Sequence, residues 1–447
     1  MAAESISSRL ATGAGHAYGV LYLVAALAYT FTQKTFWQGF NKEKKARLAR
    51  ASRNLWSLQE SLEGIRHKFL KLKNGTQLHY LEATPSVAAK SDCLVIFIHG
   101  FPDSSHLWTK YLRSSSLAGQ AKLVALDLPG CGGSDSLDRY GPDQMLNAIA
   151  EAIVLLRERY QSKHEDLSGK QQQCILVAHD WGGIIAFRLA AQTTGLFDHY
   201  IAVNTMYPVA AEANIYSKLA QTKQLLKKGK LPSALRIFGP VMVQLLMSSY
   251  VYMMNLELSF DKVCPALTWA LVEGSHKLAY KKYPEPSPEE EANRLALACG
   301  PGAAEAKLPA DDGSMYGPSV YERATRWNVP GNWDGRVKLY TQGLFRGKWT
   351  PDYPGISTLP LSKKSEDTVV DKRFKYPVTC IFGMKDIALD PRVMLDGIEE
   401  FFLPSSDGLC ESKIVRLPEG GHWCMIEKDG EEAIEAELAL LLRGHES

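Results

Sequence analysis

One stretch, from Cys174 to Leu189, constrains the fold of this chain more than any other. Four apolar residues, Ile175 to Ala178, come just before Asp180, and apolar residues at helical spacing follow it. This pattern predicts a buried strand that breaks sharply into a helix, with an acidic residue at the break. Small residues, Ala178 and Gly182, stand two positions before and after Asp180. A strained strand-to-helix turn needs such neighbours, so Asp180 is predicted to occupy its tip.

The predicted turn has the frame of a nucleophile elbow, with a carboxylate where a serine usually stands. A carboxylate is already ionised at pH 7, and it suits displacement at an sp³ carbon, which leaves an alkyl ester on the enzyme. A matching substrate carries a strained ring or a good leaving group, as an epoxide or an alkyl halide does. The alternative role is structural, because aspartate is also a favourable N-cap for the helix that follows.

The composition of the chain limits which architectures and which partners are possible. With 447 residues and 45% hydrophobic content, the chain can bury one large core and still carry a long insertion and an N-terminal extension. The formal net charge is only +2, so nucleic acid is not expected as a partner. Eight cysteines are scattered singly without metal-type pairing, which indicates free thiols in a reducing compartment.

The N-terminal segment predicts contact with membrane lipid. From Leu10 to Gln33 no side chain is formally charged, and a run of cations then extends from Lys34 to Arg53. An apolar helix followed by cations predicts a single-pass anchor, with the catalytic domain in the cytosol at the endoplasmic reticulum. We therefore expect an anchor over residues 1–35 and a basic helical linker over 36–64. Two alternatives stay open: a cleaved signal peptide on a secreted protein, and a helix packed on the surface of a soluble one.

The rest of the chain alternates strand and helix patterns. Apolar runs at 94–98, 123–126, 200–203, 378–382 and 414–417 predict strands, and Asn74-Gly75 predicts the turn of a hairpin. Strands that alternate with helices form a mostly parallel sheet. The strand pattern disappears after 200–203 and returns only at 378–382. We expect a core at 65–204 and 376–447, with a helical lid at 205–375 whose polar stretches 284–291 and 310–317 are solvent loops.

Chemically useful residues follow four of the predicted strands. Phe101, Asp180, Asp386 and His422 each stand just after a strand, and the carboxyl ends of parallel strands form the site-bearing edge of such a sheet. The order nucleophile, acid, histidine predicts a triad in which His422 activates water and Asp386 orients it. Asp390 is the rival acid.

An oxyanion needs hydrogen-bond donors beside the nucleophile. The backbone N–H groups of Phe101 and Trp181 are our candidates, because the first lies in an irregular loop after a strand and the second follows Asp180.

These motifs together resemble the α/β-hydrolase epoxide hydrolases, specifically the subgroup with an aspartate nucleophile. The matching pieces are His99-Gly100-Phe101-Pro102, His179-Asp180-Trp181-Gly182-Gly183, Asp386 with Ala388 and Leu389, and Gly421-His422-Trp423. The resemblance implies an α/β-hydrolase fold with an eight-stranded, mostly parallel sheet and an inserted cap. It also implies conversion of a small lipophilic epoxide and water into a vicinal diol, with no metal or organic cofactor. Regiochemistry, stereochemistry and oligomeric state stay open.

The same resemblance implies two lid tyrosines that hydrogen-bond the epoxide oxygen. Tyr250 is the first candidate, with Tyr252 as its alternative, and Tyr340 is the second. A phenol suits the role because it is a weak acid that can stabilise a developing alkoxide.

Two other functions compete with this interpretation. A haloalkane or haloacid dehalogenase would use the same nucleophile, but Phe101 occupies the position where the dehalogenases commonly place a halide-binding asparagine. A catalytically silent hydrolase fold that only binds a ligand is the other possibility, although no member of the triad is missing from the sequence.

Overall fold

The computed structural model describes most of the chain. It covers residues 6–32, 42–56, 64–84, 92–161, 172–256, 258, 265–300, 333–345, 347–350, 357–358, 372–404 and 411–443. The expected loop at 310–317 lies outside these residues.

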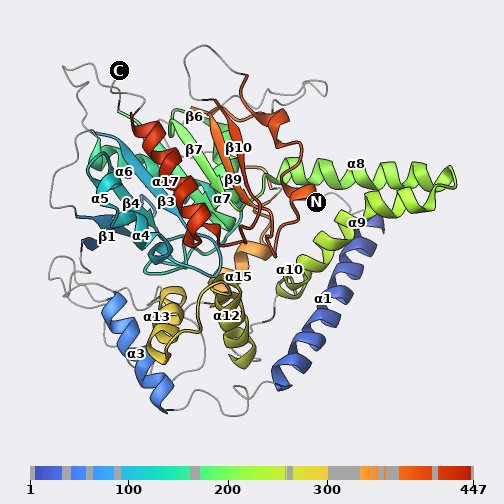
Figure 1. Cartoon of the computed structure of the whole chain (residues 1–447), viewed down its shortest axis with the longest axis horizontal. Helices are drawn as coiled ribbons and strands as arrows, with labels where there is room; N and C mark the ends of the chain where they lie inside the picture. Colours follow the sequence, from blue (N-terminus) through green and yellow to red (C-terminus); the bar gives the residue numbers. More distant parts are fainter. Residues whose placement is uncertain are drawn as a thin grey trace.

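An eight-stranded sheet forms the centre of the molecule (Figure 1). Its spatial order is β1-β2-β4-β3-β5-β7-β9-β10, and only the β1–β2 and β2–β4 pairs are antiparallel. The strands are β1 (Ile65–Lys71), β2 (Gln77–Ala83), β3 (Leu94–Ile98), β4 (Lys122–Leu126), β5 (Cys174–His179), β7 (His199–Val203), β9 (Val378–Gly383) and β10 (Lys413–Leu417). The mostly parallel eight-stranded sheet predicted from the sequence is thus confirmed, as is the hairpin turn between β1 and β2.

Apolar side chains cover both faces of the sheet. Alternate residues of β3 enter two separate cores: Leu94, Ile96 and Ile98 lie in one, and Val95 and Phe97 lie in the other. Helices α6 (Pro142–Tyr160) and α7 (Asp180–Gln192) supply the first core. Helices α4 (Thr109–Leu112), α5 (Ser115–Ala118) and α17 (Lys428–Arg443) supply the second. Strands buried on both sides explain the continuous apolar runs in the sequence.

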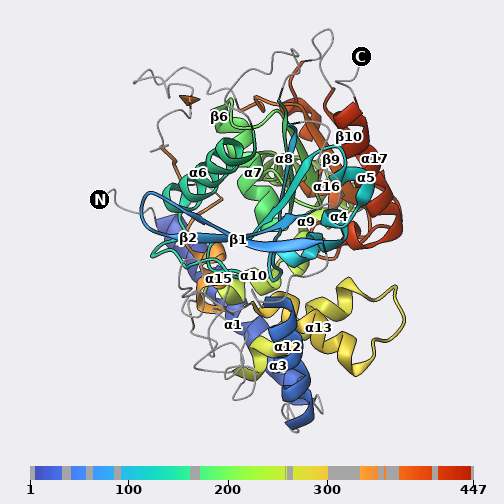
Figure 2. The ribbon, with the colours of Figure 1, turned by 90° about the vertical axis from the view of Figure 1, so that its left-hand side faces the viewer.

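The segment between β7 and β9 is where the sequence predicts a lid, and we keep that name for its helices. It contains α8 (Pro208–Lys227), α9 (Leu231–Met247), α10 (Ser249–Met254), α12 (Pro265–Ala279), α13 (Pro288–Cys299) and α15 (Trp333–Thr341). Figures 1 and 2 show α10, α12, α13 and α15 gathered at one end of the sheet. A two-residue strand β8 (Ser357–Thr358) also pairs with β6 (Thr193–Thr194).

One loop expected from the sequence is partly helical. Residues 288–291 form the first turn of α13, although the polar composition of the segment 284–291 favours a solvent loop. The side chain of Ser287 accepts a hydrogen bond from the backbone of Glu290, whose carboxylate in turn accepts one from the backbone of Ser287. This capping box satisfies the open end of the helix, so the acidic run starts α13 instead of preventing it.

Both described N-terminal helices pack on the lid. Helix α1 (Ile6–Thr32) lies beside α10, and α3 (Lys42–Trp56) lies beside α13. The indole of Trp56 donates a hydrogen bond to the carbonyl of Ala296 at 3.1 Å. Within the described residues, Gly13–Thr32 is the one helical stretch long and apolar enough to cross a membrane.

Candidate active site

Asp180 stands at the junction of β5 and α7 in a strained backbone conformation. Its φ angle is 48°, a left-handed value that non-glycine residues rarely adopt. The chain can approach this turn closely because two glycines face it. A Cβ on Gly182 would lie 2.4 Å from the carbonyl oxygen of His99, and a Cβ on Gly100 would lie 2.4 Å from the Cβ of Asp180. The turn is therefore a nucleophile elbow in its geometry.

Both carboxylate oxygens of Asp180 have defined neighbours. The backbone N–H of Phe101 donates to Oδ1 at 2.8 Å, and the backbone N–H of Trp181 also donates to the carboxylate. Nε2 of His422 lies 3.7 Å from Oδ2. Burial raises the pKa of Asp180, and the charge of His422 and the two N–H donors only partly offset this. The site thus holds a desolvated carboxylate with two oriented donors beside it.

Asp386 holds the other side of the histidine ring. Its Oδ2 lies 2.8 Å from Nδ1 of His422 and accepts a hydrogen bond from Nδ2 of Asn204 at 2.7 Å. Its Oδ1 accepts hydrogen bonds from the backbone N–H groups of Ala388 and Leu389 at 2.7 and 2.9 Å. Donors on both oxygens fix the orientation of the carboxylate, and therefore that of the ring.

The rival acid, Asp390, has a different set of partners. It is the N-cap of the short helix α16 (Pro391–Met394), where its side chain accepts a hydrogen bond from the backbone of Arg392 at 2.9 Å. The guanidinium of Arg392 pairs with the same carboxylate at 2.5 Å. The structure therefore places Asp386, and not Asp390, against His422.

The two carboxylates decide the charge of His422. Burial lowers the pKa of His422, but the negative charges of Asp386 and Asp180 outweigh burial and raise it to about 9. The ring is thus an imidazolium at neutral pH. Loss of either negative charge favours the neutral ring.

Two lid tyrosines lie above the elbow. Tyr250 is on α10 and Tyr340 is on α15, and their rings meet edge-on with centroids 5.9 Å apart. Tyr340 also meets the rings of Trp181 and Phe101, at 4.6 and 5.3 Å. Burial raises the pKa of both phenols, and the charge of Asp180 raises it further, so both hydroxyls stay protonated. The alternative, Tyr252, packs against Tyr18 of α1 at 5.2 Å.

Several supporting residues were not predicted from the sequence. Asn204 has a φ angle of 37° and joins Asp386 to the backbone N–H of Gly383, which donates to its Oδ1 at 3.1 Å. Thr205 donates its hydroxyl to the carbonyl of Asp180 at 2.8 Å. A polar pair directly after a buried strand was the available signal, because both residues follow β7.

A histidine next to Asp180 also supports the candidate site. Nε2 of His179 lies 3.0 Å from the carbonyl oxygen of His422, and burial lowers the pKa of His179 well below its ordinary value. A neutral His179 whose Nε2 carries the proton donates to that carbonyl and fixes the backbone of the loop that carries His422.

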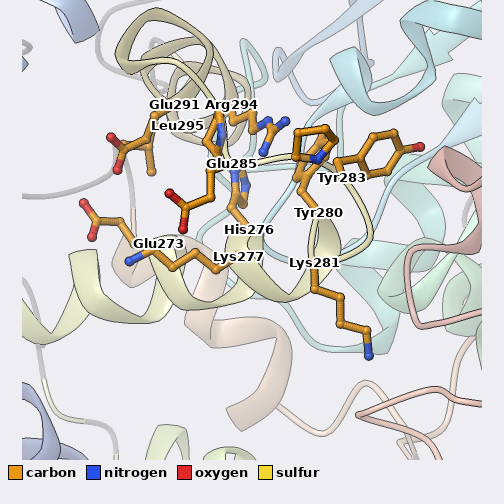
Figure 3. A pocket seen from close by; sticks show the side chains of 12 residues that line it. Glu273, His276, Lys277, Tyr280, Lys281, Tyr283, Glu285, Glu291, Arg294 and Leu295 are labelled. Atoms are coloured by element: carbon orange, nitrogen blue, oxygen red, sulfur yellow. The ribbon is translucent and has the colours of Figure 1, made fainter.

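Among the residues that the structure describes, no cluster has the composition of a metal centre. Within the ranges that the structure describes, no group of three or more His, Cys, Asp or Glu side chains could hold a metal ion. A polar hollow of about 490 Å³ lies between α12, α13 and the loop that joins them (Figure 3). There the guanidinium of Arg294 lies over the ring of Tyr280 at 3.9 Å, and Lys44 of α3 pairs with Glu273 and Glu291. These contacts join α3 to the lid.

Comparisons with known proteins identify the fold family of the chain. Residues 94–429 match the family model of the alpha/beta hydrolase fold. Epoxide hydrolase 3 from Xenopus tropicalis is 29% identical over 156 residues, which are 35% of this chain and 38% of that protein. A haloalkane dehalogenase from Mycolicibacterium smegmatis is 35% identical over 122 residues, which are 26% of this chain and 32% of that protein. The alignments thus span about a third of the length of these curated relatives.

A solved structure extends the likeness over most of the chain. A mutant epoxide hydrolase from Bacillus megaterium, in complex with its diol product, has a TM-score of 0.50 and 18% sequence identity. The match covers 84% of this chain and 99% of that one. At this level of identity, the likeness shows the fold alone.

Proposed function

Because the chain belongs to the alpha/beta hydrolase fold family, we propose that it is an epoxide hydrolase that forms a covalent ester on Asp180. One observation carries this proposal: a carboxylate stands at the strained elbow, with two backbone N–H donors at its oxygens. The names of several sequence relatives support the same reaction. The product is a vicinal diol, and the second reactant is water.

In the first step, a carboxylate oxygen of Asp180 attacks one epoxide carbon and the ring C–O bond breaks. The ring oxygen takes a proton from one of the two phenols, Tyr250 or Tyr340. The other phenol supports the proton donor by a hydrogen bond between the two hydroxyls. The supporting observation is that the ring of Tyr340 packs against Trp181, beside Asp180, and the ring of Tyr250 packs against that of Tyr340. An alkyl ester of Asp180 results.

The second step uses the change of charge that the first step produces. The ester removes the negative charge of Asp180, so one of the two charges that raise the pKa of His422 is lost. The imidazolium of His422 then gives up its proton, which restores the phenol that protonated the ring oxygen. Neutral His422, oriented by Asp386, takes a proton from water, which attacks the carbonyl carbon of Asp180. The N–H groups of Phe101 and Trp181 stabilise the oxyanion, and the proton on His422 passes to the departing alkoxide. The carboxylic acid left on Asp180 returns its proton to His422, so the carboxylate and the imidazolium of the free site are restored.

A haloalkane dehalogenase is the second candidate function. The match to a protein of that name favours it, and the nucleophile would be the same. A halide site needs an indole N–H that is free to bind halide, whereas Trp181 forms a hydrogen bond with Tyr340. Two phenols above the nucleophile suit an alkoxide oxygen better than a halide.

A direct assay separates the candidates. The purified chain is incubated with a panel of aryl and long-chain alkyl epoxides and with matched 1-bromoalkanes, while diol and bromide are quantified. We expect diol from the wild type, no bromide, and neither product from Asp180→Asn. Bromide release without diol would support the dehalogenase. Neither product from a folded protein would favour a silent binding fold.

We also propose that α1 attaches the protein to membrane lipid. The stretch Gly13–Thr32 is long and apolar enough for this role, and only 11% of it is buried in the protein. A lipophilic epoxide dissolved in the same membrane would then be the natural substrate class.

A further inference from the structure

Helix α1 packs on α10 along one side. Near its middle, the hydroxyl of Tyr18 lies 2.6 Å from Oγ of Ser249, and a Cβ on Gly19 would lie 2.4 Å from the carbonyl oxygen of Tyr252. Near its end, Thr30 is buried. The backbones of α1 and α10 therefore touch, and this side of the helix faces protein. A helix that crosses a bilayer alone is instead surrounded by lipid.

The opposite side of α1 is apolar and uncovered. Val20, Leu21, Val24 and Phe31 recur at helical spacing, and all are exposed, Leu21 by 68%. No charged side chain interrupts this face between Leu10 and Gln33. The helix therefore has one face for protein and one for an apolar solvent.

Helix α9 has the same arrangement, with its apolar face outward. Leu231, Leu235, Met242 and Leu246 are spaced by 4, 7 and 4 residues, which places them on one stripe, and Leu246 is 63% exposed. The buried side of α9 instead has Ala234, Pro240 and Gln244, and the amide of Gln244 donates to the carbonyl of Ala388. A lid helix in water would direct the large apolar side chains inward. This inversion indicates an apolar medium outside the lid.

The charge of the helical hairpin formed by α8 and α9 indicates which apolar medium lies outside the lid. Between Ala213 and Leu256 the sequence has six Lys and Arg residues and no Asp or Glu. Three of the lysines, Lys227, Lys228 and Lys230, are exposed at the turn between α8 and α9, which projects from the body in Figure 1. An exposed apolar stripe beside a purely basic turn matches an anionic phospholipid surface.

We propose that α1 and α9 form one monotopic membrane surface. The outer faces of both helices enter the same leaflet, the lysines of the hairpin bind anionic headgroups, and the N-terminus stays on the same side as the catalytic core. The two helices are continuous through α10, which follows α9 in sequence and packs on α1. This in-plane attachment replaces the single crossing expected from the sequence, and it is independent of the chemistry at Asp180.

A fluorescent label measures whether α9 meets lipid. Leu246→Cys in the full chain is labelled with NBD and mixed with vesicles of phosphatidylcholine and phosphatidylserine that contain spin-labelled lipid. The control is Leu440→Cys, an exposed leucine on α17, which packs on the sheet. Three of the native cysteines, Cys264, Cys299 and Cys410, are changed to serine in both proteins, and the five buried cysteines are kept.

The expected result is a blue-shifted label at 246 that the lipid spin label quenches, and a label at 440 that behaves as in water. The triple variant Lys227→Gln, Lys228→Gln and Lys230→Gln should partition into the anionic vesicles roughly tenfold or more weakly, with no change for phosphatidylcholine alone. A blue shift that lipid does not quench would overturn the proposal and identify a second copy of the chain as the cover. An aqueous label at 246 would overturn it as well.

Protease protection tests the in-plane position of α1. The full chain with cleavable tags at both ends is produced in sealed microsomes, and protease is added from outside. Monotopic attachment predicts that both tags are removed from the same side. Protection of the N-terminal tag alone would show that α1 crosses, and would overturn the proposal.

Discussion

Nδ1 of His422 lies 2.8 Å from Oδ2 of Asp386. The opposite nitrogen of the same ring lies 3.7 Å from the carboxylate of Asp180, so a single imidazole sits between two negative charges. The two charges stabilise an imidazolium in the free site, and an imidazolium cannot act as a base. In the proposed mechanism, the ester on Asp180 removes the charge that faces Nε2, so formation of the ester would activate the histidine.

Replacing Asp386 tests which acid orients the histidine. In Asp386→Asn the ring loses its fixed orientation and its strongest charge partner, so we expect ester hydrolysis to slow by roughly 10²- to 10⁴-fold, with a smaller effect on ester formation. Rapid-quench mass spectrometry of single turnovers measures both steps. Asp390→Asn is the matched control, because Asp390 caps α16 and does not touch His422. If ester hydrolysis slowed more in Asp390→Asn than in Asp386→Asn, Asp390 would be the acid that orients His422.

The raised pKa of His422 predicts a pH dependence of stability. Its ordinary pKa is about 6.5, and in the folded protein it is about 9. The stabilisation is therefore complete below pH 6.5 and is lost as pH rises to 9, by an amount on the order of 3 kcal/mol. The thermal midpoint of the wild type should fall across this window more than that of His422→Gln. If the thermal midpoints of the wild type and of His422→Gln fell by the same amount across this pH range, the raised pKa of His422 would be contradicted.

The two phenols should act on the first step only. Tyr250→Phe and Tyr340→Phe remove hydrogen-bond donors to the epoxide oxygen, so each should slow ester formation by at least roughly tenfold and leave ester hydrolysis nearly unchanged. Stopped-flow quenching of tryptophan fluorescence follows the two steps. Tyr252→Phe serves as the control, since that ring packs against Tyr18. If Tyr252→Phe slowed ester formation equally, Tyr252 would again be a candidate for the first lid tyrosine.

A pair of glycines tests the close packing of the elbow. Gly182→Ala places a methyl group 2.4 Å from the carbonyl oxygen of His99, and we expect a loss of roughly 1–3 kcal/mol together with lower activity. Gly274→Ala in α12 meets no atom within 4 Å, and it should stabilise the helix by about 0.5–1 kcal/mol. Denaturant unfolding compares the two. Tolerance of Gly182→Ala at full activity would contradict the close approach of the two backbones at the elbow.

The sequence predicted the parts of the fold that depend on local patterns. Strands such as β3 and β5 are buried on both faces, so their apolar runs are continuous, and the residues just after them had to lie at one edge of the sheet. The capping box at Ser287 is also a local pattern, and it marks the start of α13. The Pro and Glu residues around it favoured a loop, so this helix start was not predicted.

The unpredicted parts depend on contacts between distant segments. Asn204 acquires its role only because β7 and β9 are neighbours, and its place directly after a strand does not by itself indicate Asp386 as its partner. The meeting of Tyr250 with Tyr340 depends on how two lid helices pack across a long insertion. The close contact of α1 with α10 depends on Gly19, whose small size has meaning only once the backbone of Tyr252 lies opposite it.

The most direct test of the account is the intact mass of His422→Gln after incubation with an aryl or alkyl epoxide, followed by peptide mapping. The variant keeps the nucleophile and its two N–H donors and lacks the base, so the ester should form and persist. We expect an adduct of the mass of the epoxide on the peptide that contains Asp180. A folded variant that gains no mass, from an epoxide that the wild type converts to diol, would contradict the covalent mechanism.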